Sequence, residues 1–158
     1  MLTFEQMLLR FIAALALGAL LGLERELVGK EAGVRTVMLV AGGASLFAMI
    51  ALTLPYITAS TLGAAPDATA LNSAFGIIAN IVVGIGFLGA GLIIKTNDHP
   101  RGVTTAALIW TAAAMGTLIG IGLITFAIVA GILVTILLYV LRTLNVMESL
   151  QKNSHSEK

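Results

Sequence analysis

Three long stretches of the sequence contain no charged residue, and this feature constrains the fold more than any other. No Asp, Glu, Lys or Arg occurs in residues 36–66, 68–94 or 103–141. An uncharged apolar stretch of about 18 or more residues indicates a membrane-spanning helix. Only 11% of the residues are charged, whereas soluble domains have about 25%. The sequence therefore predicts an all-α integral membrane protein.

The lengths of these stretches predict five spans. Residues 103–141 form a stretch of 39 residues, whereas a bilayer core of about 30 Å needs about 20 helical residues. We therefore expect one turn in it, at Gly120-Ile121-Gly122. The predicted membrane domain is 1–142, and a short cytoplasmic tail, 143–158, is predicted to be disordered at its end. The predicted spans are residues 4–23, 36–54, 74–94, 103–119 and 121–141.

Lys and Arg alternate between the segments that connect the spans. The connections after the first and third spans carry three and two basic residues, the tail carries three, and the connection between the second and third spans carries none. Basic residues mark the cytoplasmic side, so we expect the amino terminus outside and the carboxyl terminus in the cytoplasm. A cleaved signal peptide is the weaker interpretation of the start, because the acidic-basic "ERE" follows its apolar part.

Residues 84–89, "GIGFLG", match the G-x-G-x-x-G dinucleotide fingerprint, but their context favours helix packing. A nucleotide-binding loop needs a preceding strand and an acidic residue about 20 positions later. Here the glycines lie in an apolar helix, and residue 104 is a threonine. Small residues let membrane helices approach closely. We therefore predict a packing role for Gly84, Gly86, Gly89 and Gly91.

The third span carries small residues on two sides of a helical projection. Asn80, Gly84 and Gly91 share one side, and Gly86 and Gly89 lie roughly opposite. This pattern predicts that the third span is the central helix and that the protein is a homo-oligomer held through glycine-rich faces. Gly18 and Gly22 predict a comparable contact face on the first span.

Charged residues at the cytoplasmic ends of the spans are the first candidate functional group. Glu24, Arg25 and Glu26 are consecutive, and in a helix the two carboxylates point about 160° apart. One carboxylate is then free to face inward to a partner such as Arg35 or Arg101. The other interpretation is that these charges only anchor the helix at the membrane boundary.

Polar residues within or beside the spans form a second candidate group. Thr104 and Thr105 are expected to cap the fourth span, and a helix start beside a basic residue also suits an anion. Three alternatives remain for Arg10: it extends outward to the membrane surface, pairs with Glu5 or Gln6, or lines a polar cavity that repels cations. Asn80 suits a hydrogen bond between helices, and Trp110 suits packing or the membrane interface.

An internal repeat is a further interpretation. A shift of 69 residues aligns residues 22–40 with 91–109 and gives six identical pairs in nineteen. A true duplication predicts that the two cytoplasmic connections lie side by side and that each ends in Gly-Val before a helix.

Several function classes find no support in the sequence. The absence of cysteine excludes disulfides, thiol catalysis and cysteine-ligated metals. The two histidines and the carboxylates form no arrangement typical of an enzyme or a metal site, and the net charge of +1 gives no indication of nucleic-acid binding. We therefore predict no cofactor and no enzymatic activity.

Three ordered segments closely resemble the MgtC/SapB family of bacterial inner-membrane proteins: "LLGLERELVGKEAGVRT", "IVVGIGFLGAGLIIK" and "RGVTTAALIWTAA". The resemblance implies a five-span domain linked to low magnesium, intracellular survival and acid stress. It also implies either magnesium transport or regulation of other membrane proteins, including the proton-translocating ATP synthase. This chain has Val37 where the family often has His, and it ends where many members continue into a soluble domain, so we expect regulation by that domain to be absent.

The sequence favours the regulator over the transporter. Mg²⁺ prefers carboxylate and water oxygens, and the second to fifth predicted spans contain no acidic residue. The first prediction is therefore a membrane regulator that lies in the lipid bilayer and binds another integral membrane protein. An ion transporter or channel, for Mg²⁺, is the alternative.

Overall fold

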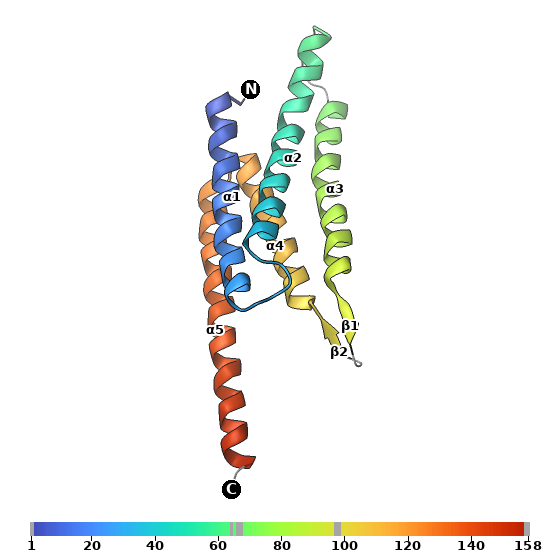
Figure 1. The fold of residues 1–158 in the computed structure, drawn as a ribbon. Helices are drawn as coiled ribbons and strands as arrows, with labels where there is room; N and C mark the ends of the chain where they lie inside the picture. The colour runs from blue at the N-terminus through green and yellow to red at the C-terminus, as the bar shows by residue number, and fades with distance from the viewer. Residues whose placement is uncertain (1, 64, 66–67, 97–98, 157–158) are drawn as a thin grey trace.

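The computed structural model describes residues 2–63, 65, 68–96 and 99–156 and has five long helices and one short two-stranded ribbon. All five helices are long and apolar enough to cross a membrane, which confirms the predicted fold class. The termini lie at opposite ends of the bundle (Figure 1). The elements are α1 (Phe4–Leu27), α2 (Val34–Thr61), α3 (Ala68–Leu92), β1 (Ile94–Thr96), β2 (His99–Arg101), α4 (Val103–Ile121) and α5 (Ile124–Ser156).

Helices α2 and α4 form the centre of the bundle, and α3 lies at its edge (Figure 1). Half of the membrane span of α2 and of α4 is buried, whereas 6% of the span of α3 is buried. The prediction that the third span is central was therefore wrong. Small residues show that a helix can be approached closely, but they do not show that the approaching helix belongs to the same chain.

The closest contact between helices joins α4 to α2. A Cβ added to Gly116 would lie 2.1 Å from the backbone oxygen of Ala41, and one added to Gly120 would lie 2.6 Å from that of Ser45. The absence of side chains at these two glycines is what lets the backbones touch, so dispersion forces act over the whole contact. The turn predicted at Gly120-Ile121-Gly122 is found at its last residue, Gly122, whose φ is 103°, whereas Gly120 still belongs to α4.

Gly18 and Gly22 serve the same purpose between α1 and α2, as predicted. Added Cβ atoms at these positions would lie 2.8 Å from the oxygen of Val37 and 2.7 Å from the Cα of Val34. In contrast, Cβ atoms added to most of the glycines of α3 would meet no atom within 4 Å, and the exception is Gly89, which would lie 3.6 Å from Ala106. The uncovered glycines of α3 are Gly76, Gly84, Gly86 and Gly91.

Several helices extend beyond the predicted spans. Helix α2 continues through Pro55 to Thr61, because proline is tolerated in membrane helices where hydroxyl groups and neighbours satisfy the backbone. Helix α5 continues to Ser156, since no Gly or Pro interrupts residues 132–156. Most of the predicted tail therefore has a helical backbone, and its last two residues lie outside the described part. The ribbon of β1 and β2 was not predicted.

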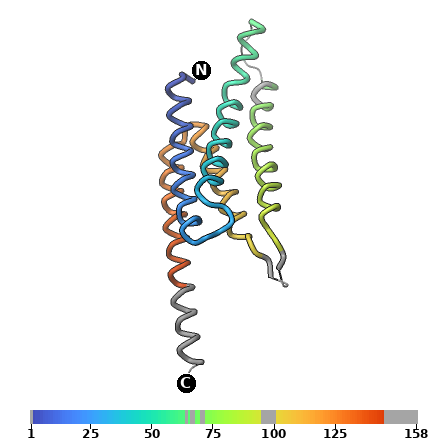
Figure 2. The backbone as a smooth tube through the Cα atoms, viewed as in Figure 1, coloured from blue at the N-terminus to red at the C-terminus, as the bar shows by residue number. Residues whose placement is uncertain are grey.

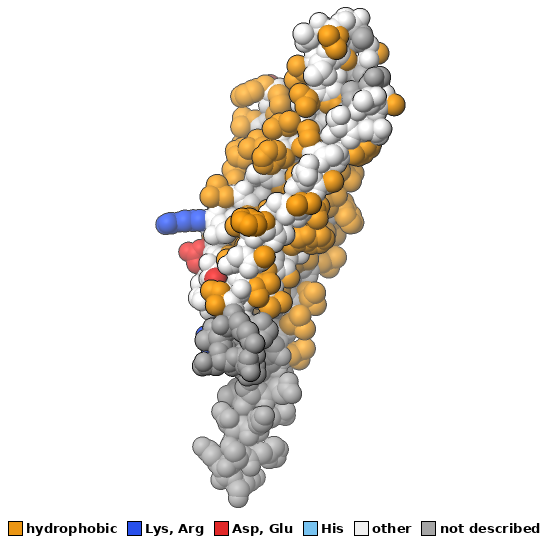
Figure 3. Space-filling view, turned by 90° about the vertical axis from the view of Figure 1, so that its right-hand side faces the viewer, with side chains coloured by type: hydrophobic (Ala, Val, Ile, Leu, Met, Phe, Trp, Pro, Cys, Tyr) orange, Lys and Arg blue, Asp and Glu red, His pale blue; other side chains and the backbone are white. Residues whose placement is uncertain are grey.

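The surface matches a protein surrounded by lipid. Apolar side chains are spread over the face in Figure 3, and the charged side chains visible there gather at its left edge, about midway down the view. Arg25, Lys30, Arg35 and Arg101 lie where α1 ends and where α2 and α4 begin. We call this end of the bundle the charged end. Its position relative to the cytoplasm stays a prediction.

Candidate functional site

Glu24 and Arg25 form a buried ion pair at the charged end. Arg25 Nε donates to Glu24 Oε2, and both residues are more than nine-tenths buried. The sequence suggested Arg35 or Arg101 as the partner of Glu24, but the partner is Arg25, its neighbour in sequence. The second carboxylate oxygen, Oε1, is buried and accepts no hydrogen bond among the described residues. A buried acceptor without a donor costs about 1–3 kcal/mol, so the ion pair with Arg25 only partly compensates the burial of this carboxylate.

Glu26 points in the other direction and supports the start of α2. Its Oε2 accepts a hydrogen bond of 2.8 Å from the backbone N–H of Val34, the first residue of α2. The N-cap residue of α2, Gly33, has no side chain to supply this acceptor. Glu24 thus faces inward and Glu26 outward, in agreement with their predicted separation, and Glu26 has a structural task.

The α1–α2 connection reaches across to α4 (Figure 2). Thr105 Oγ1 donates a hydrogen bond of 3.1 Å to Glu31 Oε2, and the next residue, Ala32, is completely buried. The backbone N–H of Glu31 and the Thr105 hydroxyl hold the pKa of the Glu31 carboxyl below its usual value of 4.5, with smaller contributions from Lys30 and Arg101. Sequence reasoning did not select Glu31, because its partner is 74 residues away.

The threonines at the start of α4 do not cap it. The N-cap is Gly102, with φ of 84° and no side-chain hydrogen bond. Thr105 is 1% exposed and is used for the contact with Glu31, whereas Thr104 faces outward. The sequence suggested that the start of α4 could bind an anion, and in the structure the carboxylate of Glu31 lies beside it. Trp110 is half exposed on α4, and Arg35 is exposed.

The predicted repeat is consistent with part of this geometry. Both α2 and α4 begin with a Gly-Val pair, and the Glu31–Thr105 hydrogen bond joins the first connection to the helix that follows the second. The two connections differ in conformation, because the first is an irregular loop and the second contains β1 and β2. Duplication itself stays a prediction.

Arg10 supports the far end of α4. Its Nη1 donates a hydrogen bond of 2.7 Å to the backbone oxygen of Gly120, and a cation at a helix carboxyl terminus is favourable. Gln6 is occupied in a capping box with Thr3 and does not pair with Arg10. Arg10 also lines a small pocket of about 270 Å³. Of the three alternatives, the structure therefore favours a position that lines a cavity, and the hydrogen bond of Arg10 to Gly120 stabilises the end of α4.

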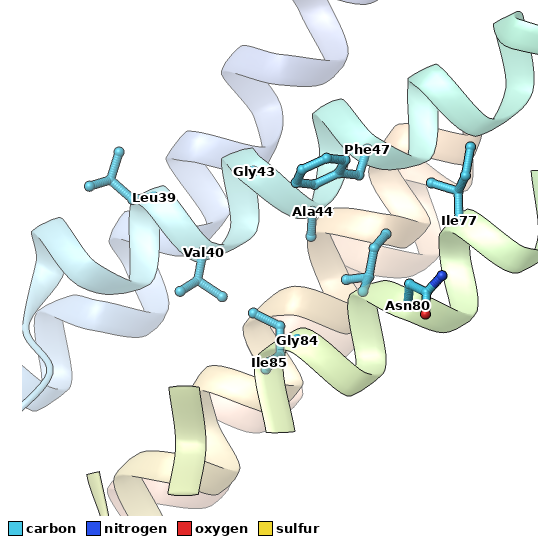
Figure 4. Close-up of a pocket in the computed structure, with 10 residues that line it drawn as sticks. Leu39, Val40, Gly43, Ala44, Phe47, Ile77, Asn80, Gly84 and Ile85 are labelled. Atoms are coloured by element: carbon cyan, nitrogen blue, oxygen red, sulfur yellow. The ribbon is translucent and has the colours of Figure 1, made fainter. Parts of the chain in front are cut away.

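A groove lies between α2 and α3 in the membrane-spanning part. We call it the α2/α3 groove. It has a volume of about 490 Å³ and includes Gly43 and Phe47 of α2 and Gly84 of α3 (Figure 4). Asn80 supplies the one polar side chain among the ten residues that line it. Asn80 is exposed and forms no side-chain hydrogen bond with the described residues.

Comparison with known protein families identifies the family of this chain. The model of the MgtC family matches residues 11–147. The chain belongs to the MgtC family. Protein MgtC of Salmonella typhimurium is 39% identical over 127 residues, which cover 80% of this chain and 48% of the Salmonella protein. The chain therefore matches about half the length of that relative.

Two other relatives are similar to this chain over more of their length. "Putative magnesium transporter YhiD" of Escherichia coli K12 is 36% identical over 98% of this chain and 68% of the E. coli protein. Protein SrpB of Synechococcus elongatus is 40% identical over 72% of this chain and 63% of that protein. No solved structure matches the chain significantly.

The three segments that carry the resemblance to the family fall on two surfaces of this structure. The "ERE" and "RGVTT" segments supply the ion pair, the Glu26 contact and the Thr105 contact of the charged end. The "GIGFLG" segment lies within α3 and continues the uncovered side of that helix. Within the described residues, no group of three or more His, Cys, Asp and Glu could hold a metal ion. The segments named above thus supply contacts between elements of the chain at the charged end.

Proposed function

We propose that this MgtC family protein is a regulator in the bacterial inner membrane that acts by binding another integral membrane protein through the α2/α3 groove. The observation that carries the proposal is the uncovered side of α3, where Asn80 and Gly84 line a groove of about 490 Å³. The family resemblance links the function to adaptation to low magnesium or acid stress and gives the proton-translocating ATP synthase as the expected partner.

The amide of Asn80 supports a protein occupant of the groove. A polar side chain in the hydrocarbon region has no water to satisfy it, and it forms no side-chain hydrogen bond with the described residues. Interhelical hydrogen bonds to Asn stabilise membrane helix association by about 0.6–2 kcal/mol. Gly84 lies one helical turn further on and leaves room for a backbone to approach, as Gly116 does inside the bundle. A helix from another molecule would satisfy both features.

A second copy of this chain is the other protein occupant that the surface suits. Asn carries both donors and acceptors, so the same amide from two copies can pair around a two-fold axis. The homo-oligomer predicted from the glycine-rich faces would then use the side of α3 that remains free within one chain. A membrane partner and a second copy would compete for one groove.

Magnesium transport is the second candidate, because a relative at 36% identity is named "Putative magnesium transporter YhiD". Glu24 is the one buried carboxylate among the described residues, and α2 and α4, the buried helices, contain no acidic residue. A transporter requires ion ligands along its path. The structure therefore gives less support to this function than to a docking role.

A matched pair of glycine substitutions tests the docking proposal. Gly84→Leu fills the groove, whereas Gly86→Leu adds the same side chain to the same helix about 160° away. Neither added Cβ meets another atom of the chain within 4 Å, so we expect both variants to fold like the parent. Crosslinking from a photoreactive residue at Phe47, followed by mass spectrometry, should capture a membrane protein in the parent and in Gly86→Leu. Loss of that product in Gly84→Leu alone supports the proposal, and equal crosslinking in all three proteins contradicts it.

Flux measurements separate the two candidates. We expect no saturable Mg²⁺ uptake into sealed proteoliposomes that contain the folded parent protein. Uptake that Glu24→Ala and Asn80→Ala both abolish would establish the transporter instead.

The orientation is tested with single cysteines, because the chain has none of its own. Leu27 and Leu62 are each 81% exposed and lie at opposite ends of the bundle. In intact cells, an impermeant thiol reagent should label Leu62→Cys and spare Leu27→Cys. The reverse pattern would place the charged end outside.

A further inference from the structure

A small pocket lies at the end of the bundle opposite the charged end. We call it the Arg10 pocket. Its volume is about 270 Å³, and none of the described residues that line it is acidic. The pocket shares no residue with the α2/α3 groove. Its lining residues come from the start of the chain and from α1, α2 and α4, and they are Leu2, Arg10, Leu52, Thr53, Tyr56 and Ile121.

One nitrogen of Arg10 fixes the guanidinium in place, and the others remain available to a ligand. Nη1 donates to the backbone oxygen of Gly120 at 2.7 Å, whereas Nε and Nη2 form no hydrogen bond with the described residues. Arg10 is partly buried, and neither nitrogen is among the fully buried polar atoms that lack a partner, so both have accessible surface. No carboxylate of the described residues forms an ion pair with Arg10. The guanidinium therefore has accessible N–H donors and an uncompensated charge.

The neighbours of the guanidinium leave room for an acceptor and add a second donor. A Cβ added to Gly122 would lie 3.0 Å from Nη2 of Arg10, so the missing side chain of this glycine keeps one side of that nitrogen uncovered. Tyr56 also lines the pocket, and its hydroxyl can donate a hydrogen bond. The hydroxyl of Thr53 donates to the backbone oxygen of Met49, so it does not compete for an acceptor in the pocket.

The Arg10 pocket lies at the level where a membrane span ends. The fourth span is Val103–Ile121, and Arg10 binds the oxygen of Gly120 in its last turn. Polar headgroups of the bilayer lie beyond the hydrocarbon core that such a span crosses. Tyrosine is enriched at this level, in agreement with the position of Tyr56. A guanidinium held here is within reach of the phosphate of a lipid.

The geometry points to a binding site for the headgroup of an anionic phospholipid such as phosphatidylglycerol. The phosphate oxygens accept from Nε and Nη2 of Arg10, a planar arrangement of donors that matches phosphate. The hydroxyl of Tyr56 donates to the same phosphate. The glycerol and the first acyl carbons contact the apolar lining residues, of which Leu52 and Ile121 come from α2 and α4.

The charge of the pocket and its apolar walls select among the possible anions. A phosphatidylcholine headgroup carries a cation as well as a phosphate, and no acidic residue among the described lining residues balances that cation. A lipid with net negative charge leaves no such cation beside the guanidinium. A free phosphate ion has no apolar part to place against Leu2, Leu52 and Ile121. An anionic phospholipid therefore satisfies both the donors and the walls.

Native mass spectrometry of the purified protein in detergent tests this site. Dioleoyl phosphatidylglycerol and phosphatidylcholine are added separately to the parent, Arg10→Gln, Tyr56→Phe and Arg35→Gln. We expect the parent to retain phosphatidylglycerol about tenfold better than phosphatidylcholine, which corresponds to about 1.4 kcal/mol. Arg10→Gln should remove that preference, and Tyr56→Phe should weaken retention of phosphatidylglycerol. Arg35→Gln removes an exposed guanidinium that does not line the pocket, so it should behave as the parent.

Three results would overturn the inference. Equal retention of the two lipids by the parent would show that the pocket does not select an anionic headgroup. Equal loss in Arg10→Gln and Arg35→Gln would show that only the overall charge of the protein matters. Displacement of phosphatidylglycerol by the same concentration of inorganic phosphate would show that the pocket selects a soluble anion and not a lipid.

The test does not depend on one variant or on the proposed function. If Arg10→Gln does not fold, the lipid preference of the parent and the retention by Tyr56→Phe decide the question. None of these measurements involves a partner protein or the α2/α3 groove, so the result is independent of the proposed regulatory function.

Discussion

Gly116→Ala tests whether the contact between α2 and α4 holds the bundle together. The added Cβ would lie 2.1 Å from the backbone oxygen of Ala41, whereas carbon–oxygen contacts in proteins are rarely shorter than about 3.3 Å. No rotamer change relieves this clash, because both atoms are fixed to helix backbones. The two helices must therefore move apart by about 1 Å along a buried interface.

The size of the effect follows from a comparison with Gly84→Ala. Both changes replace a helical glycine by alanine, which by itself favours the helix by about 1 kcal/mol. This term is the same for both variants and cancels in their difference. Gly84 has no atom within 4 Å of the added Cβ, so the difference reports the clash at Gly116. Overpacking of this kind costs about 1–3 kcal/mol, and the fixed backbone atoms place Gly116→Ala near the upper end, at about 3 kcal/mol.

Thermal unfolding in detergent measures the difference. A change of 1 kcal/mol shifts the melting temperature by about 2–4 °C in chains of this size, so Gly116→Ala should melt about 6–12 °C below Gly84→Ala. Trp110, the single tryptophan, lies on α4 and reports on this helix by fluorescence. Equal melting temperatures for the two variants would refute the claim that direct backbone contact joins α2 to α4.

Three further predictions concern the polar contacts at the ends of α4. In chemical denaturation, Arg10→Ala should lower the free energy of unfolding by about 1.5–3 kcal/mol, the value of a hydrogen bond to a charged group. Arg10→Lys should lower it less, because lysine keeps a cation near Gly120. The folded-state pKa of Glu31 is below its usual 4.5, so the ionised carboxylate stabilises the fold above pH 4.5, and this contribution is lost as the pH falls through the folded-state pKa. The melting temperatures of the parent and of Glu31→Gln should therefore converge in acid. A difference that stays constant with pH would contradict this. Thr105→Val removes one cause of the lowered pKa and should move that convergence to higher pH, whereas Thr104→Val, at an exposed position, should not.

The number of spans and the inner contact of α1 could be predicted from the sequence because both depend on local patterns. Uncharged length alone indicates a span, and Gly18 and Gly22, four residues apart, place two small residues on one face of a helix. The opposite directions of Glu24 and Glu26 follow from the helical period in the same way. These inferences need no knowledge of which helix packs on which.

The contacts that were missed depend on pairing between distant segments. Glu31 bonds to Thr105 across 74 residues, and no periodic signal marks an acidic residue in a short loop as the partner of a helix start. Arg10 and Gly120 lie 110 residues apart. The sequence therefore showed that a basic residue lies in the first span but did not show which group accepts its hydrogen bond. Pairing of this kind is decided by the arrangement of all five helices and not by any one of them.

The position of α3 links the fold to the proposed function. Small residues stabilise a membrane helix only through close contact, because lipid chains are as apolar as side chains and supply no hydrophobic driving force. Gly116 and Gly120 have such contacts within the chain, and Gly84, Gly86 and Gly91 have none within 4 Å. Only 6% of the span of α3 is buried, yet this span carries the intramembrane amide of Asn80. The same residue pattern therefore has two uses, and on α3 the contact that it predicts is available to another molecule.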